Sequence, residues 1–192
     1  MRDVSDQTKQ YFIDEYRNIH SNKQVGMMIG EQLLYWVWNI QDLTFQHAGD
    51  VRILDFGCGK GYAYKRRYVH RLWDITKVIM YDIGIKAYEK KPQLGEFNAV
   101  ISCDVLEHIP EEQLDEVFNY WYSGPNMKFV FCTIAGYPAR AKLSDGTNAH
   151  VTLRPRDWWV KKIKEHCTCT TEIIYFPSRK LQAERVILKN KS

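Results

Sequence analysis

Residues 51–62 read Val51-Arg52-Ile53-Leu54-Asp55-Phe56-Gly57-Cys58-Gly59-Lys60-Gly61-Tyr62, an apolar run followed at once by three alternating glycines. The apolar part is typical of a strand that is buried on both faces of a sheet. The glycines permit a sharp backbone turn and the close approach of a ligand to the main chain. This stretch predicts the first unit of an open α/β sheet, with a nucleotide-type ligand at the carboxyl end of the strand. A tight turn without a ligand is the alternative for the stretch taken alone.

The rest of the chain alternates between short β-rich runs and helical patterns. Strands are expected at Val51–Phe56, Lys77–Asp82, Ala99–Cys103, Phe129–Thr133, Glu172–Phe176 and Arg185–Leu188. Helices are expected between them at Tyr62–His70, Glu111–Trp121 and Pro155–His166. This alternation predicts a doubly wound, mostly parallel α/β sheet.

Two amphipathic helices are expected before the first strand. Aromatic and aliphatic residues recur at steps of three and four over Ser5–His20. A second apolar stripe ends before Gln46–Asp50 and comprises Ile29, Leu33, Trp36, Val37 and Ile40. Because 192 residues suit one domain better than two, we expect a single domain, with residues 1–48 as a helical extension of the core at residues 51–192.

Composition and charge narrow the class of protein. A chain with 45% hydrophobic and 26% charged residues is expected to fold. It has no apolar run of transmembrane length and no signal-peptide core at Met1–Asp6, so a cytoplasmic protein without a membrane partner is expected. Five cysteines without framework spacing predict reduced thiols. The net charge of +4 makes nucleic acid a possible partner, but Lys65–Arg67 fits a solvated helix face, so this partner is not favoured.

Acidic residues follow the second and third predicted strands. Asp82 ends the second strand about 20 residues beyond the glycine loop, where a carboxylate commonly accepts the ribose hydroxyls of a nucleotide. The third strand runs into Asp104-Val105-Leu106-Glu107-His108-Ile109-Pro110. These polar groups are expected at the same sheet edge as the glycine loop.

Together these segments resemble the motifs of class I S-adenosylmethionine-dependent methyltransferases. Leu54–Gly61 is similar to motif I of that family, and Tyr81–Asp82 is similar to its second-strand acidic motif. Asp104–Pro110 is similar to the "LEH" segment after its fourth strand. The resemblance covers Val51–Pro110 well. Further on, the chain is similar to small methyltransferase-like proteins of phage and bacterial genomes at Phe129–Pro138, Asp145–Pro155 and Trp158-Trp159.

The resemblance implies a Rossmann-like fold and S-adenosylmethionine as the cofactor. The three loop glycines would face its methionine moiety, Asp55 would support the loop and the amino group, and Asp82 would hold the ribose. The expected cofactor-binding residues are Asp55, Gly57, Cys58, Gly59, Gly61, Asp82, Ile83, Cys103, Asp104, Val105 and Leu106. The stretch from Asp82 to Phe97 is too short for the helix, strand and adenine contact usual in the family, so a shortened region is expected between strands 2 and 4, and the adenine contacts stay open.

Methyl transfer from a sulfonium needs few catalytic groups, because the donor is already activated. An acceptor oxygen or nitrogen that carries a proton also needs a base, and imidazole suits this role near neutral pH. His150 is the expected base, since it follows a loop that contains glycine and asparagine, with an ordering role in that loop as its alternative. His108 and Asp104 are the next catalytic candidates, with helix capping and helix entry as their alternatives.

Other conspicuous residues have simpler interpretations. Tyr11 and Tyr16 are candidates for a lid over the cofactor, or for plain core residues. Cys58 is expected to pack inside the loop and not to act as a nucleophile. His166–Cys169 lacks a second cluster of ligands, so no metal site is expected there or elsewhere.

The expected function is methyl transfer to an oxygen or nitrogen of an unidentified acceptor, small or macromolecular. One rival is a nicotinamide-dependent oxidoreductase, but Gly61 is misplaced for the Gly-x-Gly-x-x-Gly fingerprint. The other is a methyltransferase fold without turnover that serves as a binding module or partner subunit. The chain shows no amino-methylation motif of the Asn-Pro-Pro-Tyr type, which makes DNA bases a less favoured acceptor.

Overall fold

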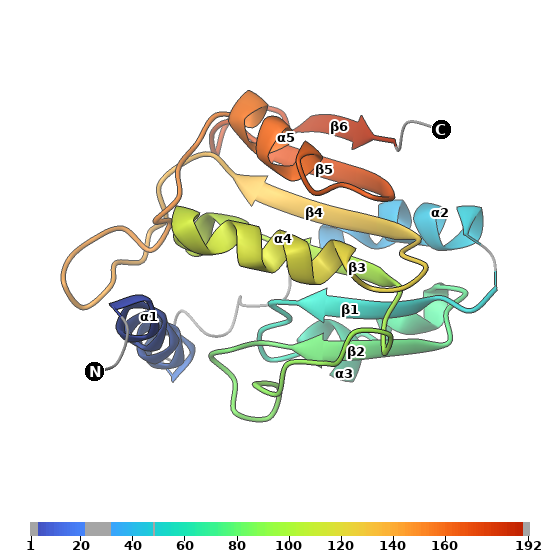
Figure 1. Ribbon diagram of the computed structural model, residues 1–192, viewed down its shortest axis with the longest axis horizontal. Helices are drawn as coiled ribbons and strands as arrows, with labels where there is room; N and C mark the ends of the chain where they lie inside the picture. Colours follow the sequence, from blue (N-terminus) through green and yellow to red (C-terminus); the bar gives the residue numbers. More distant parts are fainter. Residues whose placement is uncertain (1–3, 22–31, 48, 190–192) are drawn as a thin grey trace.

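The computed structural model describes residues 4–21, 32–47 and 49–189 of the chain. Its centre is a six-stranded sheet in the order β2-β1-β3-β4-β5-β6 (Figure 1). The strands are β1 (Arg52–Phe56), β2 (Lys77–Tyr81), β3 (Ala99–Cys103), β4 (Phe129–Ala135), β5 (Thr170–Phe176) and β6 (Glu184–Leu188). The first five in spatial order are parallel, and β6 pairs with β5 in the antiparallel direction. The mostly parallel α/β sheet is therefore confirmed.

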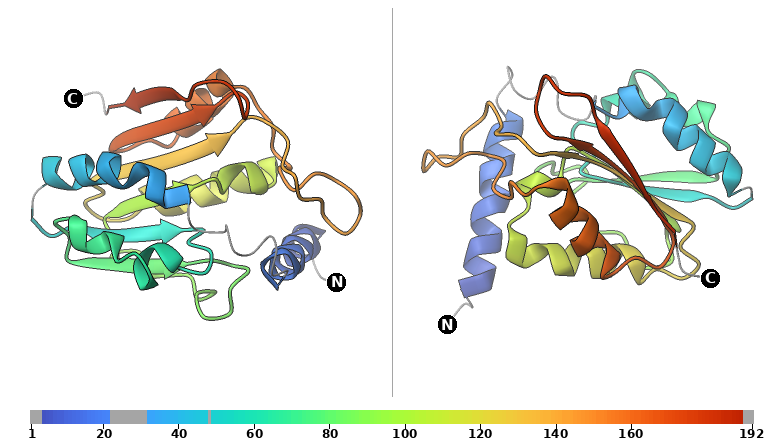
Figure 2. Two further views of the ribbon diagram at one scale, coloured as in Figure 1. Left: turned by 180° about the vertical axis from the view of Figure 1, so that it is seen from behind. Right: turned by 90° about the horizontal axis from the view of Figure 1, so that it is seen from above.

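Helices cover both faces of the sheet. The helices α2 (Val37–Gln46) and α3 (Tyr62–Lys65) pack on one face, and α4 (Leu114–Tyr122) and α5 (Arg156–Lys164) pack on the other (Figure 2). The central strand β4 is buried in all seven positions, as continuous apolar strands between two helical layers should be.

Neighbouring residues of β1 show how the strands supply two hydrophobic cores. Leu54 belongs to the core that contains Trp121 and Trp159 from the helices of one face. Ile53 belongs to the core that contains Ile40 from the opposite face. The alternation of side chains along a strand thus anchors both helical layers to the same five-residue segment.

Three helices differ from the sequence prediction, and one of them, expected at Glu111–Trp121, begins as a 3₁₀ turn at Glu111–Gln113 before α4. The expected helix at Tyr62–His70 is wrong beyond Lys65, because Tyr68 takes a left-handed conformation with φ of 52° that a right-handed helix cannot continue through. A short 3₁₀ turn at residues 69–72 follows it. The expected second helix begins as a 3₁₀ turn at residues 32–36 before α2, and its first expected residue, Ile29, lies outside the described residues.

The connection between β2 and β3 contains only turns and bends over residues 82–98, which confirms the shortened region. The chain leaves β1 for β2 on one side and then returns to β3 on the other side. Open α/β sheets bind ligands outside the carboxyl ends of the strands at such a reversal. The fold therefore predicts a site beyond the ends of β1 and β3.

Helix α1 (Val4–Ser21) packs across this carboxyl edge and not on either face of the sheet (Figures 1 and 2). The hydroxyl of Tyr16 donates to the carbonyl oxygen of His108 at 2.6 Å. Ion pairs of Lys9 with Glu116 and of Arg17 with Glu89 hold its outer side. None of the described helices combines the length and apolar character needed to cross a bilayer.

Candidate functional site

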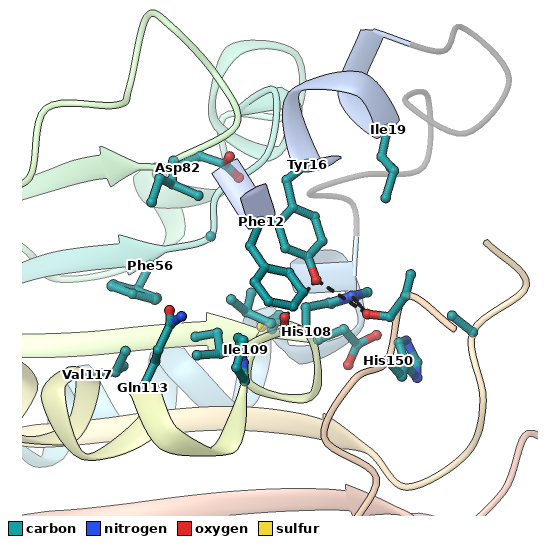
Figure 3. Close-up of a pocket in the computed structure, with 18 of the residues that line it drawn as sticks. Phe12, Tyr16, Ile19, Phe56, Asp82, His108, Ile109, Gln113, Val117 and His150 are labelled. Carbon is teal, nitrogen blue, oxygen red and sulfur yellow. Dashed lines mark hydrogen bonds between the residues drawn. The ribbon is translucent and has the colours of Figure 1, made fainter. Parts of the chain in front are cut away.

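A cavity of about 660 Å³ lies between helix α1 and the carboxyl ends of the parallel strands (Figure 3). Its walls come from α1, the strand ends, α4 and the loop at residues 136–150. A volume of this size is within the range of sites that enclose nucleotide-sized ligands. Of the predicted site residues, those that line it are Gly57, Asp82, Ile83, Cys103, Asp104, Val105, His108 and His150.

The glycine loop is held mainly by its own amides. The N–H groups of Gly57 and Cys58 both donate to the carbonyl oxygen of Tyr81, at 2.8 and 3.1 Å, and Gly61 N–H donates to Cys58. Gly59 N–H donates to Oδ2 of Asp82 at 2.8 Å. These bonds fasten the end of β1 to the end of β2, and they leave Gly57 as the loop glycine at the cavity wall.

The backbone conformation at Gly57 and its close contact with Val105 leave no room for a side chain at this position. Its φ of +83° disfavours any side chain, and a Cβ there would lie 2.3 Å from Cγ2 of Val105. Val105 itself lines the cavity. Glycine at this position therefore lets the loop after β1 and the segment after β3 meet beneath the ligand space.

Four predicted cofactor residues lie behind the cavity wall instead of in it, namely Asp55, Cys58, Gly59 and Leu106. Gly61 does not line the cavity either, and a Cβ there would lie 2.8 Å from Sδ of Met80. Leu106 is fully buried in the hydrophobic core. Burial raises the pKa of the Cys58 thiol, so Cys58 stays neutral and packs as expected.

Asp55, in β1 before the glycine loop, bonds to Tyr64, in α3 after the loop, and so ties the two ends of the loop together. The hydroxyl of Tyr64 in α3 donates to Oδ2 of Asp55 at 2.7 Å. Burial raises the pKa of Asp55 to about 7 in the folded protein. The carboxyl group thus stays protonated in the folded chain at pH values where the unfolded chain has lost that proton.

This difference predicts a pH dependence of stability. The contribution of Asp55 is present below its unfolded pKa of about 4 and is lost as pH rises toward about 7. Asp55→Asn should therefore make the urea midpoint fall less steeply between pH 4 and pH 7 than in the native chain. Asp74→Asn, at an exposed position, is the control. Equal slopes for native protein and Asp55→Asn would refute this assignment.

Asp82 lies at the covered end of the cavity. Its Oδ1 accepts from Gly84 N–H at 2.9 Å, and Nε2 of His20 lies 3.5 Å from the same oxygen. A Cβ at Gly84 would lie 2.6 Å from the His20 ring, so α1 fits closely over this strand end. Burial lowers the pKa of His20, which favours the neutral imidazole there.

The aromatic residues of α1 extend this cover over the middle of the cavity. Phe12, Tyr16 and Ile19 all line it, and Figure 3 shows the Phe12 and Tyr16 rings between Asp82 and the two histidines. Tyr16 thus has the position expected of a lid residue, whereas Tyr11 does not line the cavity.

Asp104 occupies a strained position at the end of β3. Its φ is +55°, which is rare for a residue with a side chain and recurs at functional sites. Thr133 on β4 holds it, because the threonine hydroxyl donates to Oδ1 at 2.6 Å and also accepts from the Asp104 N–H at 2.9 Å. Burial raises the pKa of Asp104.

His108 and His150 form the polar end of the cavity. Nδ1 of His108 lies 2.8 Å from the carbonyl oxygen of Ala149, and Nδ1 of His150 lies 2.6 Å from that of Tyr137. A carbonyl oxygen can only accept, so each Nδ1 carries the hydrogen and each Nε2 keeps a lone pair. Burial lowers the pKa of both rings, for His108 to about 4, and both are neutral at pH 7.

The loop that carries His150 is ordered by Asn148. Its Oδ1 accepts from the N–H groups of Ala139 and His150, both at 2.9 Å, and its Nδ2 donates to the carbonyl oxygen of Ala139. The ordering role considered for His150 thus falls largely to Asn148. The His150 ring is left to line the cavity.

Sequence reasoning gave no site role to two groups. His20 carries no motif, and only the packing of α1 brings it to Asp82. Glu107 belongs to the "LEH" segment, but it lies behind the wall, fully buried, with Oε1 accepting from Ala135 N–H at 3.1 Å. Burial, with the nearby Asp104 carboxylate, raises the pKa of Glu107.

Apart from Cys103, which lines the cavity, the other chemically reactive groups considered from the sequence lie outside it. Lys65–Arg67 is exposed, with the Arg66 guanidinium 4.0 Å from the centre of the Tyr62 ring. All five cysteines are free thiols. His166, which begins the segment examined for metal ligands, bonds instead to Asn119 and Asp115.

The fold and the site define an α/β protein with a cavity at the carboxyl edge of a mostly parallel sheet. In comparisons with protein-family models, curated proteins and solved structures, none matches this chain significantly. The geometry of the cavity is therefore the basis for assigning a function to this chain.

Proposed function

We propose that the chain is a methyltransferase that uses S-adenosylmethionine and acts on an oxygen or nitrogen of its acceptor. The observation that carries the proposal is the pairing, in one cavity, of the glycine loop and Asp82 at one end with two neutral imidazoles at the other. The first end suits a nucleoside, and the second suits a group that must lose a proton.

The residues at the nucleoside end fit this cofactor. A carboxylate has about four acceptor sites, so the two N–H bonds to Asp82 leave capacity for ribose hydroxyls. The apolar side chains of Phe56, Ile83 and Val117 line the same cavity and would pack against the adenine. His20 must move from Asp82 before a ribose can bind there, which makes α1 the proposed lid.

The residues at the other end would act on the acceptor. S-adenosylmethionine supplies a methyl group whose carbon–sulfur bond breaks as the acceptor atom attacks the carbon. His150 would receive the acceptor proton on Nε2, since its Nδ1–H is fixed on Tyr137. Asp104 would orient polar groups of the ligands, because Thr133 holds its backbone and Oδ1. Phe12 and Tyr16 would exclude water from the middle of the cavity.

Asp82→Ala tests the cofactor end. Loss of the hydrogen bonds that ribose hydroxyls would donate to the Asp82 carboxylate should weaken S-adenosylmethionine binding by about 1.5 to 3 kcal/mol, or roughly 10- to 150-fold. The measurement is calorimetric titration of each folded variant. His20→Ala is the matched control, because it uncovers Asp82 but keeps the carboxylate, and it should bind at least as tightly as the native chain. Native affinity in Asp82→Ala would mean that the ribose lies elsewhere.

Methyl transfer itself is tested with a labelled donor. Native protein and Asp82→Ala are incubated with methyl-labelled S-adenosylmethionine and fractionated cell extract. The proposal expects a labelled species that depends on native protein and decreases with the variant. Tight cofactor binding without any labelled species would favour the binding-module alternative.

A further inference from the structure

Two imidazoles and one carboxylate converge at the polar end of the cavity. One nitrogen each of His108 and His150 and one carboxylate oxygen of Glu107 lie within 4.8 Å of one another. The two rings meet edge to face, with 4.6 Å between their centres, and Figure 3 shows them side by side. Three potential ligand atoms thus come from two separate segments, the turn after β3 and the loop after β4.

The hydrogen bonds of both rings favour metal binding. Each Nδ1–H is fixed on a backbone carbonyl, that of Ala149 or Tyr137. Histidines that bind metals commonly donate their other ring N–H to a carbonyl or carboxylate in this way, which fixes the ring and exposes the second nitrogen as a ligand. The Nε2 lone pairs are therefore the ones that remain for a cation.

Glu107 supplies the independent observation. Its side chain is fully buried, and Oε2 has no hydrogen-bond partner among the described residues. Within that same part of the chain, no lysine or arginine forms an ion pair with this carboxylate, and the other oxygen, Oε1, accepts from the N–H of Ala135. A buried carboxylate oxygen without a partner is costly, and coordination of a cation removes that cost.

We propose that Glu107, His108 and His150 bind one divalent transition-metal ion. Two imidazole nitrogens and one carboxylate oxygen suit Zn²⁺, Mn²⁺, Co²⁺ or Fe²⁺, whereas Mg²⁺ and Ca²⁺ prefer all-oxygen sites. Three protein ligands leave coordination positions open, and the two histidines line the cavity. These positions therefore face the space proposed for the methyl acceptor.

The ion's role in the reaction rests on the proposed function, whereas its binding does not. A bound divalent cation lowers the pKa of an oxygen that it holds. An acceptor hydroxyl on the ion would thus lose its proton more readily, and His150 would act as a ligand instead of receiving the proton itself. Whether His150 receives the proton or holds the ion, it acts at the end of the cavity proposed for the methyl acceptor.

A second cluster in the described residues supplies a matched control. Asp115, Glu165 and His166 also bring three ligand atoms within 4.8 Å. There, however, Lys162 Nζ lies 2.6 Å from Asp115, and both nitrogens of His166 are already bonded. The ligand atoms of this second cluster therefore offer a cation no vacant lone pairs comparable to those at Glu107. His166→Gln should leave metal binding unchanged.

The test is titration of chelator-treated, metal-free protein with Co²⁺, followed by visible absorption, without S-adenosylmethionine. We expect one Co²⁺ per chain, displaced by Zn²⁺. His150→Gln and Glu107→Gln should each weaken binding more than about 10-fold, the least that loss of even a supporting contact produces. If the buried Glu107→Gln variant does not fold, His150→Gln decides alone. No Co²⁺ uptake by the native chain, or native affinity in His150→Gln, would overturn the proposal.

The two proposals fail separately. Co²⁺ binding without any binding of S-adenosylmethionine would retain the metal site and reject the methyltransferase. Binding of S-adenosylmethionine without Co²⁺ uptake would reject the metal site alone.

Discussion

Replacing His150 with alanine is expected to lower methyl transfer by about 10²- to 10⁴-fold, with the affinity for S-adenosylmethionine nearly unchanged. The reason is the separation of the two ends of the cavity. Asp82 and the glycine loop are fastened to each other at one end, by the 2.8 Å bond from Gly59, and His150 lies at the other end on a different loop. Its Nε2 acts on the acceptor, directly or through a cation, and does not contact the proposed nucleoside site.

The measurements are turnover at saturating donor and calorimetric affinity for the donor. His166→Ala, a histidine outside the cavity, should retain native turnover. Added imidazole should restore part of the turnover of His150→Ala, because a structural role would not respond to it. Full turnover in His150→Ala would show that His150 is not the base, and His108 or Asp104 would then be the candidates that receive the acceptor proton. Joint loss of thermal stability and donor affinity would show that His150 is structural.

Gly57→Leu is expected to lower the affinity for S-adenosylmethionine more than about 100-fold in a folded protein, because a side chain replaces ligand space. The Cβ alone would lie 2.3 Å from Cγ2 of Val105, so either the leucine or Val105 must move into the cavity. Donor affinity is measured by calorimetry, and folding is checked by circular dichroism.

Gly49→Leu separates this effect from backbone strain. Gly49 also has a positive φ, +102°, but, its own chain neighbours aside, no atom of the described residues lies within 4 Å of its Cβ position. It should lose stability from strain and keep its donor affinity. Native affinity in a folded Gly57→Leu protein would exclude the glycine loop from the ligand site.

The sheet could be predicted because its strands are continuous apolar runs. Phe129–Ala135 is buried throughout, and such a run has few alternatives to a central strand. The end of α3 could not be predicted, because the sequence gives no sign that Tyr68 adopts a positive φ. The position of α1 across the carboxyl edge depends on contacts such as that of Tyr16 with His108, far apart in the sequence.

The candidate site was predictable residue by residue only in part. Asp82, Asp104 and His150 follow strands whose carboxyl ends meet, so topology alone brings them to one cavity. The sequence placed all three loop glycines against the ligand, but the loop amides turn toward Tyr81 and Asp82 and leave only Gly57 at the wall. The residue types in the sequence could not show that Glu107, close to His108 and His150, would keep one oxygen without a hydrogen-bond partner among the described residues.

The most direct measurement is calorimetric titration of the native chain with S-adenosylmethionine and, separately, with NAD⁺. We expect one S-adenosylmethionine per chain with a Kd on the order of micromolar, about −8 kcal/mol, and no measurable binding of NAD⁺. Absence of S-adenosylmethionine binding, or equal binding of NAD⁺, would contradict the proposed function.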